Sequence, residues 1–493
     1  MDSLNIFSFF LVLLLYFATM IGVSIYFYRK NKNISDYILG SRRLGAWVTS
    51  LSAEASDMSG WLLMGLPGLA YVCGGCAIWT ALGLTLGTYA NWRWIAGRLR
   101  AYTEIAGNAL TIPDFLQNRF HSNSNAIRIF SAIFIFFFFV IYVSSGLIAG
   151  GKLFSLILPV SYLQAVYVTA MVTATYTLIG GFSAVCWTDA IQGIMMFLAV
   201  IGVPIAAIYH CGGIGKTIHQ LYASGREFIN PLLAADGHTL SPIKIISMLA
   251  WGLGYFGQPH ILARFMAVRS QNEIPLARRI AMHWVIWSLL AAVLVGILGH
   301  LCLPVELEGA AVENIFLLLV NSLFSPLFLS LILLGILAAI MSTASSQLLV
   351  AASSFSRDLY VTIFHKNAKS TELLWVSRGS VLMASVLAVI FARNPASLIL
   401  NVVAYAWAGF GSCLGPALLF SLFWRRTTER GVLVGIIAGG ITVFTWKKFM
   451  PVNLYEIIPG FLVSALAIAI CSFADKQPNG AILRTFNAVH GKS

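Results

Sequence analysis

Thirteen apolar runs, each long enough to cross a bilayer as a helix, dominate the sequence. They lie at residues 5–28, 46–67, 71–92, 128–151, 162–181, 186–209, 243–262, 280–302, 314–343, 373–392, 397–424, 431–449 and 456–474. Hydrophobic residues make up 59% of the 493 residues, and charged residues make up only 10%. No water-soluble fold of this length can cover so much apolar surface with so few polar side chains. The sequence therefore predicts an all-α polytopic membrane protein with thirteen transmembrane helices.

The basic residues predict the orientation of these spans. If the N-terminus lies outside, 24 of the 31 Lys and Arg residues fall in cytoplasmic segments and 7 fall in outer segments. Loops rich in Lys and Arg stay in the cytoplasm, so we expect the N-terminus outside and the C-terminus inside. The same residues stand singly or in groups of two or three between apolar runs. The net charge of +13 therefore does not indicate a nucleic-acid-binding face, which needs many phosphate contacts.

The seven cysteines do not indicate a disulfide framework, because their count is odd and most of them lie in apolar runs. Cys73 and Cys76 form a single C-x-x-C pair. No βαβ pattern surrounds this pair, and no second pair completes a zinc site. We interpret the two cysteines as small residues of a membrane segment.

Two of the apolar runs contain features that interrupt a helix. The second run holds Glu54 and Asp57 shortly before Gly60, and a carboxylate within a span is costly and by default marks a site. The seventh run holds three glycines and Pro259 within eight residues, which will not support a continuous helix. Interrupted spans five apart indicate an inverted repeat of five plus five spans, with substrate and ion bound at the breaks. The alternative for the carboxylates is a salt bridge inside the helix bundle.

Hydroxyl side chains gather on one face of the ninth run. Ala339, Ser342, Thr343 and Ser346 share this face, and two interpretations stay open. Small residues let a neighbouring helix approach closely. Alternatively, the hydroxyls act with carbonyls freed by a broken helix to bind sodium, because a hard cation prefers oxygen ligands.

A few other polar or aromatic residues stand out within the spans. Trp251 and Tyr255 lie four residues apart in the seventh run, where they face either one cavity or the membrane interface. Asp189 opens the sixth run and is either a helix cap or a gate partner of a basic residue. Arg42 and Arg378 lie near inner ends of spans, where the bias of basic residues toward the cytoplasm also explains them.

Three long motifs carry a resemblance to a known family. They are SAEASDMSGWLLMGLP at Ser52–Pro67, WGLGYFGQPHILARFM at Trp251–Met266 and ILAAIMSTASSQLLV at Ile336–Val350. Residues 36–40, 401–415 and 455–461 agree as well. Together these motifs resemble the solute:sodium symporter family, and within it the branch of sodium/proline symporters. The resemblance covers essentially the whole chain.

This resemblance implies a leucine-transporter-type fold with a five-plus-five inverted repeat in spans 2–11. The two core repeats are expected at about 46–209 and 243–424, within a single transporter domain over 1–493. Span 1 at 5–28 and spans 12 and 13 at about 431–474 are expected to be peripheral.

The resemblance also assigns roles to residues. Sodium is expected at the backbone oxygens of Ala55, Met58 and Ala339 and at the hydroxyls of Ser342 and Thr343, with Asp57 essential to sodium-dependent function. The residues expected to meet proline are Ser59, Gly60, Trp61, Tyr142, Trp251, Tyr255 and Pro259. Arg42, Asp189 and Arg378 match positions tied to coupling or gating. Glu54 departs from the pattern, because related proline carriers have a small residue there. Its carboxylate either alters cation affinity or is paired elsewhere.

These features lead to one functional hypothesis. We expect a sodium-coupled symporter that imports L-proline across the cytoplasmic (inner) membrane by alternating access. Its partners would be L-proline, sodium as the coupling ion and the lipid bilayer, with no other cofactor and no obligate protein partner. The alternative is a sodium symporter of another small solute, such as pantothenate, a sugar or a monocarboxylate, on the same fold. The sequence holds no catalytic cluster, so we do not expect an enzyme.

Overall fold

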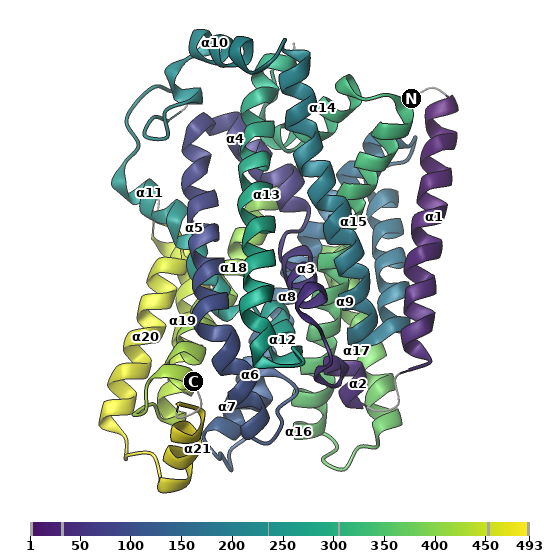
Figure 1. The fold of residues 1–493 in the computed structure, drawn as a ribbon. Helices are drawn as coiled ribbons and strands as arrows, with labels where there is room; N and C mark the ends of the chain where they lie inside the picture. Colours follow the sequence, from purple (N-terminus) through teal and green to yellow (C-terminus); the bar gives the residue numbers. More distant parts are fainter. Residues whose placement is uncertain (1–2, 31–33, 235, 304–305, 451–453, 491–493) are drawn as a thin grey trace.

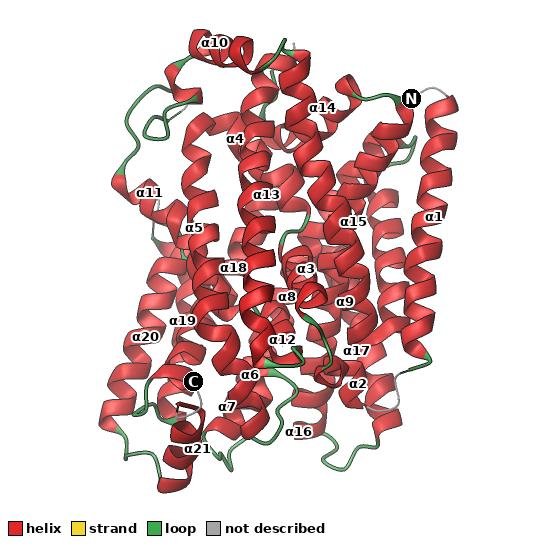
Figure 2. Cartoon of the chain, in the orientation of Figure 1, coloured by secondary structure: helices red, strands yellow, loops and turns green. Residues whose placement is uncertain are grey.

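The computed structural model describes residues 3–30, 34–234, 236–303, 306–450 and 454–490. Figure 2 shows that this part of the chain is helical throughout, joined by loops. Isolated bridges link Leu44 to Val268 and Leu233 to Thr239. Ten helices in the described ranges are long and apolar enough to cross a membrane. The predicted all-α architecture with many apolar spans is confirmed.

Long helices stand side by side and form most of the bundle (Figure 1). They are α1 (Ser3–Tyr28), α8 (Ala126–Ile157), α9 (Tyr162–His210), α13 (Ile274–Cys302), α15 (Pro326–Ser353), α17 (Ser370–Phe391), α18 (Ile399–Phe423), α19 (Glu429–Phe449) and α20 (Ile457–Ala474). At one edge α1 packs against α9 and α15, and at another α19 and α20 pack against each other and α18.

Shorter helices complete the bundle and its two ends. Between α1 and α8 in the sequence come α2 (Ile34–Leu39), η1 (Gly40–Arg42), α5 (Ile78–Ala90), η4 (Asn91–Ile95), α6 (Ala96–Ile105) and α7 (Ile112–Arg119). Later in the chain come α10 (Ile214–Ser224), η5 (Arg226–Phe228), η7 (Gln271–Glu273), η8 (Gly309–Asn314), α14 (Ile315–Leu323), η9 (Ser354–Tyr360), α16 (Val361–Ile363) and α21 (Gly480–His490).

The first predicted break is present between α3 (Ala46–Asp57) and η2 (Trp61–Gly65), which leads into α4 (Leu66–Cys73). Met58 leaves the helical region, with φ −86° and ψ 81°. Gly60 is required because a Cβ atom there would lie 2.7 Å from the Cβ atom of Ala149 in α8. The polypeptide is therefore unwound beside Asp57 and packed tightly against α8.

The second predicted break lies in the segment α11 (Pro242–Leu249), η6 (Ala250–Gly257) and α12 (Pro259–Ala267). Tight 3₁₀ turns replace the α-helix in η6, and Gln258 is extended before Pro259 begins α12. A Cβ atom at Gly257 would meet the Phe410 carbonyl oxygen at 2.2 Å. Close contact with α18 therefore requires glycine in this segment.

Helix α9 contains both the fifth and the sixth predicted runs. At 1.5 Å per residue its 49 residues would extend about 70 Å, whereas a bilayer core is about 30 Å thick. Gly181 resolves this mismatch, because its φ of 68° is non-helical and bends the chain. One glycine thus takes the place of the loop expected between 181 and 186.

The prediction for the ninth run, 314–343, is wrong at both ends. The short helix α14 ends at Leu323, and α15 begins only at Pro326 and continues to Ser353. Proline has no backbone N–H, so it starts a helix readily but cannot continue one. Beyond residue 343, α15 continues through buried small residues that pack against α9 and α8, and helical turns extend to Ile363, so the connection to α17 is much shorter than the predicted runs imply.

The interpretation of Cys73 and Cys76 as unconnected small residues is also wrong. The two cysteines form a disulfide, with a Cα–Cα distance of 5.8 Å. Cys73 ends α4 and Cys76 lies in η3 (Gly74–Ala77). Gly74 has a φ of 66°, and this turn, which a continuous apolar span would not contain, brings the cysteines together.

Candidate functional site

Oxygen atoms from α3 and α15 converge beside the first helix break. Ser342 Oγ lies 2.7 Å from the Ala55 carbonyl oxygen and 3.2 Å from that of Ala339. Thr343 Oγ1 lies 3.3 Å from the same Ala55 oxygen. These residues are all buried, and Met58 follows directly at the break. Four of the five oxygens expected for sodium therefore lie together, in a setting that suits a hard cation.

Asp57 faces a different part of the structure. Its Oδ2 accepts a hydrogen bond from the Tyr255 hydroxyl at 2.6 Å, and its Oδ1 is buried without a partner. Its carbonyl oxygen accepts hydrogen bonds from Trp61 Nε1 and from the Tyr142 hydroxyl, both at 3.1 Å. In the described ranges no Lys or Arg forms an ion pair with Asp57. The salt-bridge interpretation is thus wrong for this carboxylate.

Aromatic side chains surround the unwound segment. Trp61 lies 6.3 Å from Trp251 between ring centroids, and Tyr255 lies 5.1 Å from Trp407. Trp407 in α18 also donates a hydrogen bond to the Trp251 carbonyl oxygen at 2.8 Å. The sequence did not single out Trp407, because a tryptophan in an apolar span is as typical of the membrane interface as of a binding site. This aromatic cluster joins both broken segments to α18.

The remaining predicted substrate residues lie at the two breaks. Ser59 is in the unwound stretch, where its hydroxyl accepts a hydrogen bond from the Trp61 amide at 3.4 Å. Gly60 follows it, and Pro259 is the first residue of α12. All three are buried; Ser59 and Gly60 directly precede Trp61, and Pro259 follows Tyr255 by four residues.

Asp189 is a member of a buried polar network that links four helices. Its Oδ2 lies 3.0 Å from an Arg264 guanidinium nitrogen, and it accepts hydrogen bonds from Ser52 at 2.9 Å and from Ser346 at 3.0 Å. Arg264 also donates to Ser52, to Ser346 and to the His260 carbonyl oxygen. Of the two options for Asp189, the structure supports a basic partner. Arg264 itself was missed, because it looked like one more basic residue at an inner end.

Arg42 and Arg378 do not join this network. Arg42 donates hydrogen bonds to Thr103, Asn108 and the carbonyl oxygen of Met266, which ties η1 to α6 and α12. Burial, followed by the charge of Arg100, lowers the pKa of Arg42 to about 10, so the guanidinium stays charged at neutral pH. The guanidinium of Arg378 lies 5.2 Å from the Trp375 ring centroid. The described residues show no hydrogen bond or ion pair among Arg42, Asp189 and Arg378.

The comparison with known proteins decides the family. The model of the Sodium:solute symporter family matches residues 37–439. This chain belongs to the sodium:solute symporter family. Among its relatives, the Sodium/proline symporter of Escherichia coli (strain K12) is 46% identical over 96% of this chain and 94% of that protein. The High-affinity proline transporter PutP of Bacillus subtilis (strain 168) is 46% identical over 95% of this chain and 98% of that protein.

A solved structure supports the same fold for this sodium:solute symporter family member. A Na⁺-coupled sialic acid symporter in a substrate-bound, outward-open state superposes with a TM-score of 0.78. It shares 18% sequence identity, and the match covers 96% of this chain and 99% of that chain. The likeness at this identity shows a common helical architecture.

A second buried ion pair in this symporter was missed from the sequence. Lys152 Nζ lies 2.8 Å from Glu313 Oε2, and Glu313 also accepts hydrogen bonds from the amides of Ile399 and Leu400. The carboxylate thus caps the N-terminus of α18 and holds α8 beside η8. An isolated glutamate in an apparent loop gave no signal of this role.

Proposed function

We propose that this chain is a sodium-coupled symporter that imports L-proline across the cytoplasmic membrane by alternating access. The observation that carries the proposal is the convergence of the Ala55 and Ala339 carbonyls with the Ser342 and Thr343 hydroxyls at a helix break. The names of the relatives, which are 46% identical over nearly their full length, supply the solute and the ion. No observation favours the alternative solutes.

In this proposal the ion site consists of oxygens from two helices, α3 and α15, that would move relative to each other during transport. Sodium would bind the carbonyls of Ala55, Met58 and Ala339 and the hydroxyls of Ser342 and Thr343. The hydroxyls that now donate to the Ala55 carbonyl would turn their lone pairs toward the ion. Sodium would thereby hold α3 against α15, and Asp57 would add negative charge nearby.

The proline site would lie in the aromatic cluster between the two breaks. L-proline is a zwitterion with a compact apolar ring, and the rings of Trp61, Tyr142, Trp251 and Tyr255 offer apolar faces with polar edges. The N-terminal ends of η2 and α12 carry the positive ends of helix dipoles, which would favour its carboxylate, as broken helices do in transporters of this design. Ser59, Gly60 and Pro259 would shape the same space.

Transport requires the site to open to one side at a time. Asp189 pairs with Arg264 of α12, and Arg42 donates to a carbonyl oxygen of the same helix. Both contacts join α12 to neighbouring helices, so these residues would control opening toward the cytoplasm. Arg378 would act with them, from α17. Ion and solute would bind one state more tightly than the other, and this difference would drive the change in conformation.

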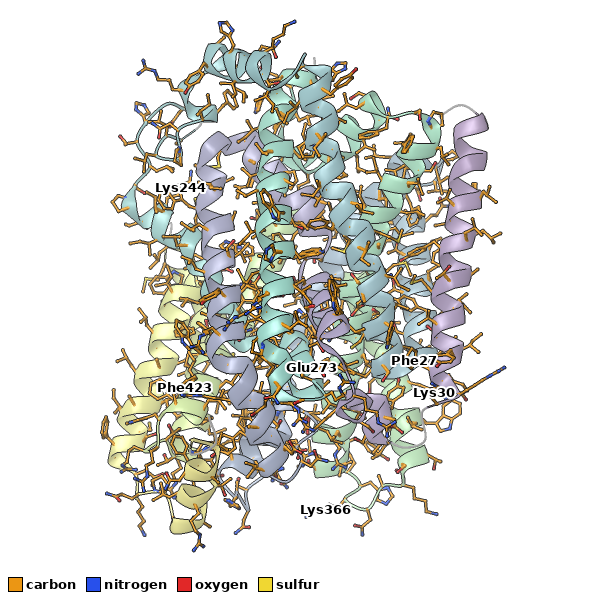
Figure 3. All side chains as sticks on the ribbon, viewed as in Figure 1. Phe27, Lys30, Lys244, Glu273, Lys366 and Phe423 are labelled. Atoms are coloured by element: carbon orange, nitrogen blue, oxygen red, sulfur yellow. A yellow bond between two sulfur atoms is a disulfide. The ribbon has the colours of Figure 1, made fainter. Side chains whose placement is uncertain are left out.

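The proposal includes a topology. We propose thirteen spans in a single domain over 1–493, with the five-plus-five inverted repeat in spans 2–11 and with α1, α19 and α20 peripheral. The N-terminus would lie outside and the C-terminus in the cytoplasm. The transporter would contact the lipid bilayer and would need no obligate protein partner. Lys244, in the upper part of the molecule, and Lys366, at its lower end (Figure 3), would then face opposite sides of the membrane.

Uptake by the purified protein in proteoliposomes tests the proposed function. An inward sodium gradient should drive saturable accumulation of labelled L-proline, and removal of the gradient should abolish accumulation. Unlabelled proline should compete, whereas pantothenate, sugars and monocarboxylates should not. Accumulation of one of these solutes in place of proline would contradict the proposal.

A further inference from the structure

Three arginine side chains line one pocket at the end of the bundle where α6 and α21 lie (Figure 1). Arg93 comes from η4, Arg98 from α6 and Arg278 from α13. The pocket has a volume of about 460 Å³. Among the described residues that line it, none is Asp or Glu. The fold thus brings three positive charges together from separate elements, without a negative charge beside them.

The three guanidinium groups keep their hydrogen-bond donors free. In the ranges that the structure describes, none of them forms an ion pair or donates a hydrogen bond. The guanidinium carbon of Arg98 lies 4.2 Å from the Phe423 ring centroid, and that of Arg278 lies 5.7 Å from the Tyr89 ring centroid. Contacts of this kind stabilise a cation through the ring face and occupy no N–H group. The donors are therefore available to an acceptor in the pocket.

The carboxylates nearest to these arginines along the chain are engaged elsewhere. Glu273, the last residue of η7, lies 2.5 Å from a guanidinium nitrogen of Arg269. Glu104 of α6 lies 2.7 Å from Arg100 Nη1. Like charges gathered in one pocket repel, so an anion that binds there is favoured. The planar guanidinium matches phosphate in particular, because two parallel N–H groups meet two phosphate oxygens.

The helices that form the pocket also present an apolar surface. Helices α5 and α13 pack against each other, and Leu86 of α5 and Leu276 and Leu290 of α13 are exposed. Leu86 precedes Arg93 by about two helical turns. Trp94, which lines the pocket, is also exposed, and tryptophan is enriched where the hydrocarbon of a bilayer meets its headgroups. A ligand of this pocket therefore meets both positive charge and a lipid-facing surface.

We propose that the pocket binds the phosphate of an anionic phospholipid. The guanidinium groups of Arg93, Arg98 and Arg278 donate hydrogen bonds to the phosphate oxygens, and the acyl chains lie along the exposed leucines of α5 and α13. A zwitterionic lipid adds an ammonium group that the arginines repel, and inorganic phosphate lacks the acyl chains. In the proposed orientation the lipid belongs to the cytoplasmic leaflet. This lipid joins the α5–α6 junction to α13, whichever solute the chain carries.

Thermal unfolding of the purified full-length protein in detergent micelles tests the site, because a ligand of the folded protein raises Tm. The probes are cardiolipin, phosphatidylglycerol, phosphatidylethanolamine and inorganic phosphate, at equal phosphate concentration. We expect a saturable rise in Tm with the two anionic lipids and no rise with the other two probes. An equal rise with phosphatidylethanolamine would show that lipid charge is not recognised. An equal rise with inorganic phosphate would show a site for a soluble anion. Either result overturns the proposal.

Two adjacent arginines of α13 provide matched variants. Arg278→Gln removes a guanidinium that lines the pocket, whereas Arg279→Gln removes the same charge from an exposed residue outside the pocket lining. Arg278→Gln should weaken the apparent affinity for cardiolipin by about tenfold or more, because charge-assisted hydrogen bonds to the phosphate are lost. Arg279→Gln should keep the affinity of the unaltered protein. Equal affinities in the two variants overturn the proposal.

A third variant decides the matter if Arg278→Gln does not fold. Arg93 lines the pocket and is exposed, so Arg93→Gln leaves the packing of the bundle intact. Native mass spectrometry counts the cardiolipin molecules that stay bound to the protein after it is released from the micelle. We expect Arg93→Gln to lose most of the cardiolipin that the unaltered protein and Arg279→Gln retain. Equal retention in Arg93→Gln and in the unaltered protein overturns the site.

Discussion

Asp57 lies where α3 ends and connects this end to the aromatic cluster through the hydrogen bond from Tyr255. Asp57→Asn keeps the shape and removes the charge, so we expect normal insertion in the membrane but loss of most sodium-driven proline accumulation. The apparent sodium affinity should fall by at least about tenfold, because a buried negative charge near the ion is lost. The measurement is uptake against sodium concentration, normalised to the protein in the membrane.

Two further variants separate charge from structure at this position. Asp57→Glu should retain more activity than Asp57→Asn, because it keeps the charge and only displaces it. Tyr255→Phe removes the hydrogen bond to Asp57 and should affect proline affinity as well, because its ring lies in the aromatic cluster. If Asp57→Asn accumulates proline with unaltered sodium dependence, Asp57 has no part in coupling.

Ser342 and Thr343 present their hydroxyls to the same carbonyl oxygen of Ala55. The double variant Ser342→Ala and Thr343→Ala should weaken apparent sodium affinity by about tenfold or more, because two oxygen ligands are removed. Proline affinity at saturating sodium should change less. Ser345→Ala is a suitable control, since its hydroxyl donates within α15 to the Ser342 carbonyl oxygen. An unaltered sodium dependence would leave close helix packing as the role of these small residues.

At the scale of elements, the Asp189–Arg264 pair holds α9 against α12, and its hydroxyl partners add α3 and α15. Both side chains are almost completely buried. Asp189→Asn should therefore lower the stability of the folded protein by about 3–5 kcal/mol, because it leaves the guanidinium uncompensated. The measurement is thermal unfolding in detergent micelles.

A double substitution distinguishes an isolated charge from lost packing. Asp189→Leu combined with Arg264→Met removes both charges and should recover much of the stability lost in Asp189→Asn. Arg430, which is exposed and lies 3.8 Å from the partly buried Asp475, provides a control, and Arg430→Gln should cost at most about 1 kcal/mol. A double variant as unstable as Asp189→Asn would show that the network acts through shape alone.

At the scale of the whole molecule, the proposed orientation determines which end of the bundle meets the outside. Lys244 lies in the upper part of the molecule and Lys366 at its lower end (Figure 3), and both side chains are exposed. In a background without reactive native thiols, a membrane-impermeant reagent added to intact cells should label Lys244→Cys and spare Lys366→Cys. Both should react after the cells are permeabilised. Labelling of Lys366→Cys in intact cells would reverse the topology.

Much of the fold, and the convergence of oxygens that we propose as the ion site, was predictable from the sequence, because both depend on local chemistry. Apolar runs near 20 residues must become spanning helices, since no water in the bilayer satisfies an exposed backbone. Glycines, Pro259 and the carboxylates of the second run marked both helix breaks in advance. Hydroxyls at residues 342 and 343 are neighbours on α15 and meet the broken end of α3, as the motif resemblance implied.

Other features depend on which helices lie together, and this only the tertiary structure decided. Composition cannot assign Arg264 to Asp189, Lys152 to Glu313 or Trp407 to Trp251, because each pair joins residues at least 75 positions apart. The bend at Gly181 and the disulfide between Cys73 and Cys76 depend on single positive-φ glycines inside apolar stretches. Hydrophobicity determines that a segment enters the membrane. Packing against neighbouring helices determines where it bends and which polar groups it pairs.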